Sequence, residues 1–276
     1  IAAGVDHDRV RGDVSGPATG GKVNLPSFRL TSPHVAFSQK VDLGQDWSLL
    51  PSAGVRFYDH SQYASKSAPH AGVSLVSAAL TVFANASRGI NYPGLEAPAL
   101  QAALPFMFAG TTWGRLSPEE LDHSEIGVKL NPWESTQIDL SLFRDAVRNR
   151  YVYDLAFGTT TFYNLGAYRV NGGELSIRQQ VSRDWSLFGG LTQLNPSISN
   201  LPYSPKQALT LGVSGRVGPL RLAIDAQSQS EVWALNRDRN TLNPNLTRVG
   251  GFSVVNARIS YPLAAFGSKG EVFLAM

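Results

Sequence analysis

Apolar and polar residues alternate along most of this chain. From Thr136 to Phe143, the apolar residues Ile138, Leu140 and Leu142 are separated by polar ones. The same period of two recurs in further segments at 126–130, 174–178, 209–217, 219–227 and 254–261. A helix would spread the charges around its axis, whereas here they stay on one side. The pattern predicts an all-β fold of about 13 strands, each with one apolar and one polar face.

The connections between the predicted strands alternate between short and long. Short ones are expected at 42–46, 77–79, 131–135, 182–184, 215–219 and 262–270. Long ones are expected at 11–33, 59–69, 88–121, 148–160, 194–206 and 231–250. In bacterial outer-membrane barrels, short turns face the periplasm and long loops face outside. The alternation therefore favours an antiparallel transmembrane β-barrel over a soluble sandwich.

Tryptophan gathers at the predicted short turns. Trp47, Trp133 and Trp185 all lie at or just after one, and the segment 46–49 (Asp-Trp-Ser-Leu) recurs at 184–187. Three tryptophans at one boundary of the membrane would form part of an aromatic girdle. The alternative is that they are partly buried residues of a soluble core.

Composition agrees with the barrel interpretation. Only 16% of the 276 residues are charged, against about 25% in an ordinary soluble domain. No apolar run is long enough for a transmembrane helix, which needs about 18 residues. The chain has no cysteine, which excludes disulfides and thiolate chemistry. The net charge is +3 and the basic residues are scattered, so nucleic-acid binding has little support.

The residues that could carry chemistry form no catalytic pattern. Ser74 and Ser77 lack the Gly-x-Ser-x-Gly context of hydrolases. The five histidines are scattered, with no two at metal-ligand spacing. The glycine pairs lie in loops, without the strand–helix unit that phosphate binding needs. We expect no enzyme activity, no metal site and no cofactor.

Several segments resemble the TonB-dependent receptor family. The segment 116–120 (Leu-Ser-Pro-Glu-Glu), followed by 124–129 (Ser-Glu-Ile-Gly-Val-Lys), is similar to a Leu-x-Pro-Glu and Glu-x-Gly-x-Lys motif of that family. Residues 82–89 resemble its strand ending in aromatic-Ala-x-x-Ser-x-Gly. Residues 164–175 resemble its Asn-x-Gly and Gly-x-Glu-aliphatic strand, and 252–256 resemble a late strand. These segments occur in the same order as in the family, and together they span about residues 36–276.

The resemblance implies a 22-stranded barrel plugged by a separate N-terminal domain. The chain would supply about strands nine to twenty-one of that barrel. The odd number of predicted strands also indicates an incomplete barrel, because single-chain bacterial barrels have an even number of strands. We therefore expect residues 1–276 to be a single domain, a partial barrel that is incomplete at both ends. The plug and the TonB-contacting segment would lie outside this chain.

The long loops hold the candidate ligand residues. Aromatic faces and guanidinium groups suit a flat, anionic metal chelate, through stacking, cation–π contact and charge-assisted hydrogen bonds. The candidates are Tyr58, His60, Tyr63, Phe106, Trp113, Arg115, Tyr153, Trp233, Arg237 and Arg239. The alternative is that these loop aromatics only pack the loops together. On the polar face of the strands, charges of both signs are expected to form a solvated wall.

Together the residues and the resemblance lead us to expect a bacterial outer-membrane receptor. It would import a scarce nutrient, with a ferric siderophore as the leading candidate, and TonB would supply the energy through the plug. Outer-membrane lipid, including lipopolysaccharide, would surround it. A passive porin and a soluble β-sandwich binding protein remain as alternatives, and haem, cobalamin or an oligosaccharide remain as other cargoes.

Overall fold

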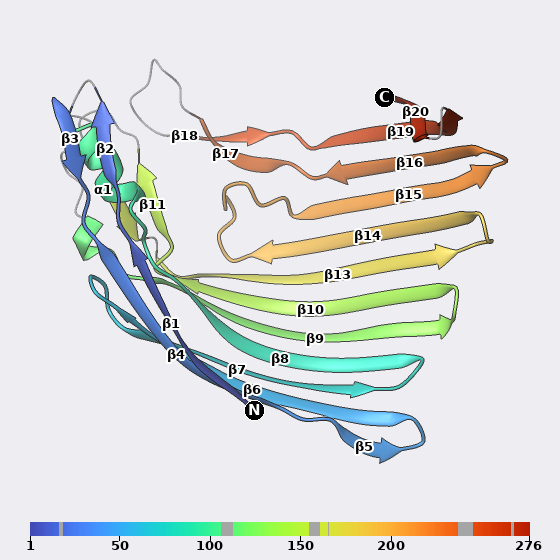
Figure 1. The fold of residues 1–276 in the computed structure, drawn as a ribbon, viewed down its shortest axis with the longest axis horizontal. Helices are drawn as coiled ribbons and strands as arrows, with labels where there is room; N and C mark the ends of the chain where they lie inside the picture. Colours follow the sequence, from blue (N-terminus) through green and yellow to red (C-terminus); the bar gives the residue numbers. More distant parts are fainter. Residues whose placement is uncertain (17–18, 106–112, 155–160, 165, 237–244, 266–267) are drawn as a thin grey trace.

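The chain forms one large curved antiparallel sheet, as a computed structural model shows (Figure 1). The model describes residues 1–16, 19–105, 113–154, 161–164, 166–236, 245–265 and 268–276. The strands of the large sheet, in their hydrogen-bonded order, are β1 (Ala2–Val10), β4 (Phe28–Ser38), β6 (Trp47–His60), β7 (Lys66–Val76), β8 (Leu80–Asn91), β9 (Glu119–Trp133), β10 (Thr136–Arg148), β13 (Tyr168–Gln180), β14 (Trp185–Pro196), β15 (Gln207–Val217), β16 (Leu220–Gln229), β19 (Phe252–Ala265) and β20 (Ser268–Ala275).

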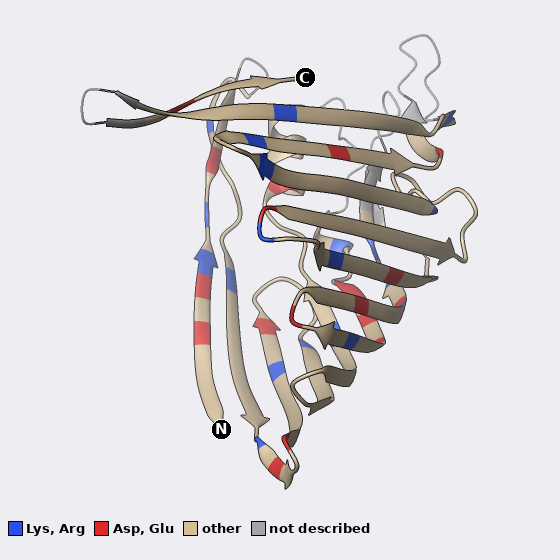
Figure 2. Ribbon diagram, turned by 90° about the vertical axis from the view of Figure 1, so that its right-hand side faces the viewer, with Lys and Arg blue, Asp and Glu red and all other residues tan. Residues whose placement is uncertain are grey.

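The order of these strands confirms the predicted meander. Thirteen strands follow one another along the path, and the short β5 (Val41–Gly44) pairs with β6 beside the end of β4. Strands β4 and β5 therefore share one place in the sheet. In Figure 2 the sheet curves into a trough, with β1 and β20 as its two edges.

The short and long connections lie at opposite ends of the strands (Figure 1). We call these ends the short-turn end and the long-loop end. The long connections contain additional elements, namely hairpins β2–β3 (Asp13–Gly16 and Gly21–Asn24), β11–β12 (Tyr151–Asp154 and Thr161–Asn164) and β17–β18 (Val232–Asn236 and Asn245–Val249), helix α1 (Glu96–Ala103) and the 3-10 turn η1 (Trp113–Arg115). None of the described helices is long and apolar enough to cross a membrane.

The strands run further into the long-loop end than the sequence predicted. Strand β4 begins at Phe28, inside the predicted loop 11–33, and β9 begins at Glu119 instead of after Leu121. The alternation of apolar residues fades in these extensions because ion pairs and loop contacts, instead of lipid, cover them. Hydropathy alone therefore placed the starts of these two strands too late in the sequence.

Cross-strand register confirms that the two faces differ in polarity. Val73, Ala84, Ile126 and Leu142 are aligned in one row across β7, β8, β9 and β10. Ile126 and Leu142 are 56% and 58% exposed, so no described residue covers the apolar face at these positions. The opposite, polar face carries residues such as Glu125. An uncovered apolar face of this kind is what lipid covers in a transmembrane barrel.

Close packing on the polar face joins aromatic rings to glycines of the next strand. The ring of Phe143 on β10 lies over Gly172 on β13, and the ring of Phe83 on β8 lies over Gly127 on β9. Only a residue without a side chain leaves room for a ring at this distance. These contacts fix the register of neighbouring strands without a large buried core.

Candidate ligand site at the long-loop end

An aromatic cluster assembles at the long-loop end from segments far apart in the sequence. Phe28 opens β4, His60 closes β6, Tyr63 lies in the loop that follows, Tyr92 follows β8 and Trp113 lies in η1. The His60 and Tyr92 rings are stacked, with centroids 4.7 Å apart. The Phe28 ring lies 5.4 Å from His60, 5.7 Å from Tyr63 and 6.0 Å from Trp113. These separations fall in the range of favourable ring contacts.

Burial divides the cluster into an anchor and a rim. Tyr63 is only 6% exposed and packs with Phe28, Leu116 and Phe162. Tyr58, His60, Tyr92 and Trp113 are half-buried, so part of each ring remains accessible. The rim rings could therefore stack on a bound aromatic group, while Tyr63 holds the loop in place.

The polar atoms of His60, Tyr92 and Tyr63 differ in their hydrogen-bond partners. The backbone N–H groups of Gln62 and Tyr63 donate to His60 Nδ1 at 3.1 and 3.3 Å, so this nitrogen carries no proton. The Tyr92 hydroxyl donates to the Ala64 carbonyl at 3.0 Å. The Tyr63 hydroxyl is buried and has no partner among the described residues. Burial raises the pKa of Tyr63 and of Tyr92 to about 12, which keeps both phenols neutral at physiological pH.

An ion-pair network borders the cluster. Glu120 on β9 accepts from Lys66 Nζ at 2.6 Å and from Arg148 at 3.1 Å. Asp122 accepts from Arg88 Nε at 2.6 Å and from Arg148 at 2.8 Å. The Glu120 side chain is only 10% exposed, so solvent screens its pairs weakly. Three cations surround the two carboxylates of this network, while Asp59 and Glu96 add negative charge beside the rings and contribute to the raised pKa of Tyr92 and Tyr63.

Two long loops are joined beside the network. Asn164, at the end of β12, accepts from the backbone N–H of Ser117 at 2.8 Å and donates to the Ser117 carbonyl at 2.9 Å. The same amide donates to the Asn149 carbonyl at 2.6 Å. Nearby, Arg150 donates to the Tyr168 hydroxyl at 3.0 Å. The loop after β10 and the segment before β9 are thereby held together.

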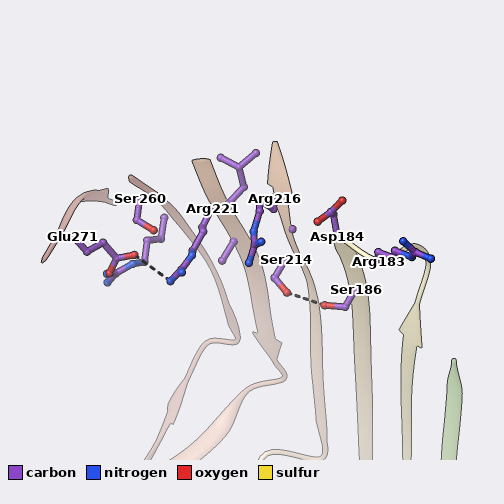
Figure 3. A pocket seen from close by; sticks show the side chains of 12 residues that line it. Arg183, Asp184, Ser186, Ser214, Arg216, Arg221, Ser260 and Glu271 are labelled. Carbon is purple, nitrogen blue, oxygen red and sulfur yellow. Dashed lines mark hydrogen bonds and ion pairs between the residues drawn. The ribbon is translucent and has the colours of Figure 1, made fainter. Parts of the chain in front are cut away.

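A second charged region lies on the polar face at the short-turn end (Figure 3). It lines a cavity of about 440 Å³ whose charged residues are Arg183, Asp184, Arg216, Arg221, Arg258 and Glu271. Glu271 accepts from Arg258 at 3.1 Å and pairs with Arg221 at 4.0 Å. Ser186 and Ser214 share a hydrogen bond of 2.8 Å. The region belongs to the polar wall that the sequence predicted, with arginine in excess.

The structure brings together four of the ten predicted ligand residues. Tyr58 joins His60, Tyr63 and Trp113, since its ring centroid lies 6.1 Å from that of Tyr92. Arg115 closes η1 and is exposed.

The other predicted ligand residues fall outside this cluster. Trp233 lies on β17, where the Arg248 guanidinium stands 5.8 Å from its ring. Tyr153 pairs with Phe162 in the β11–β12 hairpin, and its side chain is not among the described parts. Phe106, Arg237 and Arg239 lie outside the described residues.

The sequence analysis missed most of the ion-pair network. Lys66, Arg88, Glu120 and Asp122 were not among the predicted site residues. Arg88 and Glu120 do lie in two of the segments that resemble the receptor family, and those segments pair as β8 and β9. The recurrence of charged residues within family-like segments was the signal that could have identified them.

The model of a single protein family covers almost the whole chain. Its description is TonB dependent receptor-like, beta-barrel, and it matches residues 3–275. The chain belongs to the TonB-dependent receptor family. Members of this family reside in the bacterial outer membrane and are transporters, not enzymes. The expected localisation and the expected class of protein are thereby confirmed.

Sequence relatives of this receptor barrel include siderophore receptors. The catecholate siderophore receptor Fiu of Escherichia coli (strain K12) is 29% identical over 106 residues, which is 34% of this chain and 14% of Fiu. The Fiu proteins of two pathogenic E. coli strains match to the same extent. The chain thus spans only a small part of the curated relatives that it matches.

Solved structures show the same fold. The siderophore receptor PirA from Acinetobacter baumannii superposes with a TM-score of 0.65 and 12% identity, covering 88% of this chain and 40% of PirA. The copper transporter OprC gives a TM-score of 0.67 and 14% identity, covering 94% of this chain and 45% of OprC. At these identities the likeness establishes the barrel fold alone. The predicted fold class is confirmed.

Proposed function

We propose that this receptor barrel serves the active uptake of a metal chelate, with a ferric siderophore as the cargo and TonB as the energy source. The observation that carries the proposal is the cluster of half-buried rings Tyr58, His60, Tyr92 and Trp113 at the long-loop end, beside the ion pair between Lys66 and Glu120. The long-loop end of a bacterial outer-membrane barrel faces outside. A cargo arriving from the medium meets these residues first.

The chemistry of this end fits a flat anion with aromatic groups. Ring faces stack on aromatic ligand groups. Arg115 is exposed, while Pro118, three residues further along the same segment, is fully buried. A guanidinium group binds an anionic chelate through charge-assisted hydrogen bonds. Catecholate chelates of ferric iron combine aromatic rings with negative charge. The Escherichia coli relative Fiu is described as a receptor for that class.

Membership of the family supports TonB as the energy source. We propose that TonB acts through a plug domain outside this chain, and that residues 1–276 form one partial barrel domain. In this scheme the long loops first capture the cargo and close over it. TonB then moves the plug. No bond is broken in the cargo. Passive diffusion through an open pore is the competing scheme.

A binding experiment on the full-length receptor in detergent tests the proposal. Tryptophan fluorescence would be titrated with a ferric catecholate, a ferric hydroxamate and free Cu²⁺. We expect the ferric catecholate to bind most tightly. Tyr58→Ala should weaken binding several-fold, in line with the ~0.5–1.5 kcal/mol of one aromatic contact.

Phe57→Ala is the matched control for Tyr58→Ala. Phe57 is adjacent on β6 and 52% exposed, and alternation points it to the opposite face. Its removal should leave the affinity unchanged. Equal losses in both variants would contradict the proposed site, and binding of none of the three probes would contradict the proposed cargo class.

A further inference from the structure

The apolar face changes character abruptly toward the long-loop end. The row of Val73, Ala84, Ile126 and Leu142 is followed, one row further, by Ala71, Ala86, Ser124 and Arg144 across the same four strands. The next row contains Arg88, Asp122 and Ala146. A row of mainly large aliphatic side chains is thus followed by a row of small ones that also holds Arg144, and then by an ion pair between Arg88 and Asp122.

The height of this transition matches the edge of a membrane. Trp133 on β9 stands at the short-turn end and is 69% exposed. Ser124 lies nine residues back along the same strand. At about 3.4 Å per residue and a tilt of about 40°, that distance is roughly 23 Å of membrane height. The apolar band of such barrels is about 25 Å tall, so the small-residue row lies at the outer interface.

The small residues leave a groove on this face. It has a cavity volume of about 440 Å³. Its lining on the apolar face consists of Pro69, Ala71, Ala86, Arg88, Asp122, Ser124, Arg144 and Ala146. The floor is apolar and its upper rim is charged. A groove of this kind accepts a hydrocarbon chain below and an ionic group above.

The two arginines that line the groove, Arg88 and Arg144, differ in their ion pairs. Arg88 donates from Nε and from a terminal nitrogen to Asp122, at 2.6 and 3.2 Å, and Arg148 pairs with the same carboxylate. Arg144 is exposed and has no ion pair among the described residues. Its guanidinium is therefore available to an anion that approaches from the membrane side.

We propose that this groove binds a phosphorylated lipid of the outer leaflet, with the phosphate on Arg144 and an acyl chain over Ala71 and Ala86. The long-loop end faces outside, so the outer leaflet supplies the occupant. Guanidinium groups bind phosphate with paired, charge-assisted hydrogen bonds. Basic residues at a membrane surface attract anionic headgroups in the same way. The bound lipid would order the outer wall of β7 to β10.

The test uses the full-length receptor extracted from outer membranes in detergent. Native mass spectrometry would count bound lipid, and titration with lipopolysaccharide and with its dephosphorylated form would give relative affinities. We expect Arg144→Ala to lower the affinity for the phosphorylated form about tenfold, the scale of one hydrogen bond to a charged group. The same variant should not change the affinity for the dephosphorylated form.

Two further variants keep the test decisive. Arg178→Ala removes an exposed arginine from the neighbouring strand β13, on the polar face, and should leave lipid binding unchanged. Ala86→Trp fills the groove and should weaken both lipid forms, while retained heat-modifiable gel migration shows that the barrel is folded. Equal lipid binding by the wild type and Arg144→Ala, or equal affinity of the wild type for both lipid forms, would overturn the proposal.

Discussion

The side-chain amide of Asn164 pairs with the backbone N–H and carbonyl of Ser117, in the way that a neighbouring β-strand would. It accepts from the Ser117 N–H at 2.8 Å and donates to the Ser117 carbonyl at 2.9 Å. The two residues are 47 positions apart and belong to different long loops. One side chain therefore fixes the segment that leads into β9 and into the ion-pair network around Glu120.

Loss of this amide should loosen the long-loop end. In Asn164→Ala, the exposed N–H of Ser117 exchanges its amide acceptor for water, at a cost of ~0.5–1.5 kcal/mol for one net hydrogen bond. Hydrogen–deuterium exchange of residues 113–117 should therefore accelerate several-fold. Asn171→Ala is the control, because Asn171 is exposed on β13. Unchanged exchange in Asn164→Ala would show that other contacts hold the loop.

Glu120 should be the most sensitive carboxylate of the network. Glu120→Gln keeps the shape but leaves Lys66 without its charged partner and Arg148 with Asp122 alone, so we expect the free energy of unfolding to fall by ~1–3 kcal/mol. Thermal unfolding of the full-length receptor measures the change. Glu119→Gln is the control, since Glu119 accepts a weak 3.4 Å hydrogen bond from Asn91 and forms no ion pair with the described residues.

A double-mutant cycle tests whether the Lys66–Glu120 ion pair accounts for the loss of stability in Glu120→Gln. The cycle combines Lys66→Met with Glu120→Gln. The two effects should fall short of additivity by ~0.5–3 kcal/mol, as for directly coupled residues. Additive effects would mean that Lys66 and Glu120 act independently.

Tyr63 should remain protonated well above the ordinary range of a phenol. Burial raises its pKa from 10.0 to about 12 in the folded receptor. The folded state therefore holds this proton more firmly than the unfolded chain. The stabilising effect is complete below about pH 10 and is lost as the pH rises toward about 12.

Ultraviolet difference titration of wild type against Tyr63→Phe isolates this group. In the folded receptor the phenolate signal of Tyr63 should appear near pH 12, and in denaturant near pH 10. A single transition near pH 10 in both states would show that Tyr63 is solvated, and that the aromatic cluster is looser than the structure indicates.

The contact between Phe143 and Gly172 should tolerate no added side chain. A methyl group in Gly172→Ala would overlap the Phe143 ring, which should lower the free energy of unfolding by ~1–3 kcal/mol. Gly190→Ala is the matched control, because the nearest atom there is the Leu175 carbonyl oxygen at 3.9 Å. The added substitution Phe143→Leu should restore part of the loss. Equal thermal stability of Gly172→Ala and Gly190→Ala would refute the packing.

The strands were predictable from sequence because a membrane barrel imposes period two on each of them. Ile138, Leu140 and Leu142 face lipid, so each must be apolar regardless of what lies beyond the loops. The number of strands and the positions of the short turns follow from that local rule. The Asp-Trp-Ser-Leu repeat at 46–49 and 184–187 is likewise local, since both tryptophans begin a strand at the short-turn end.

The candidate site was only partly predictable because its contacts are not local. Lys66 meets Glu120 across 54 positions, and no periodicity in the sequence encodes that meeting. The aromatic loop residues were recognised by type, but the deep burial of Tyr63 depends on Phe28, Leu116 and Phe162. The hairpins inside the long loops escaped prediction because they are too short for alternation to stand out.

The central claim is energised uptake of a ferric chelate, and transport in living cells tests it most directly. Cells without siderophore receptors of their own would express the full-length receptor, with and without TonB, and be given a radiolabelled ferric catecholate. The account predicts accumulation that needs both the receptor and TonB, and that falls in Tyr58→Ala but not in Phe57→Ala. Accumulation that persists without TonB would contradict the account and favour a passive channel.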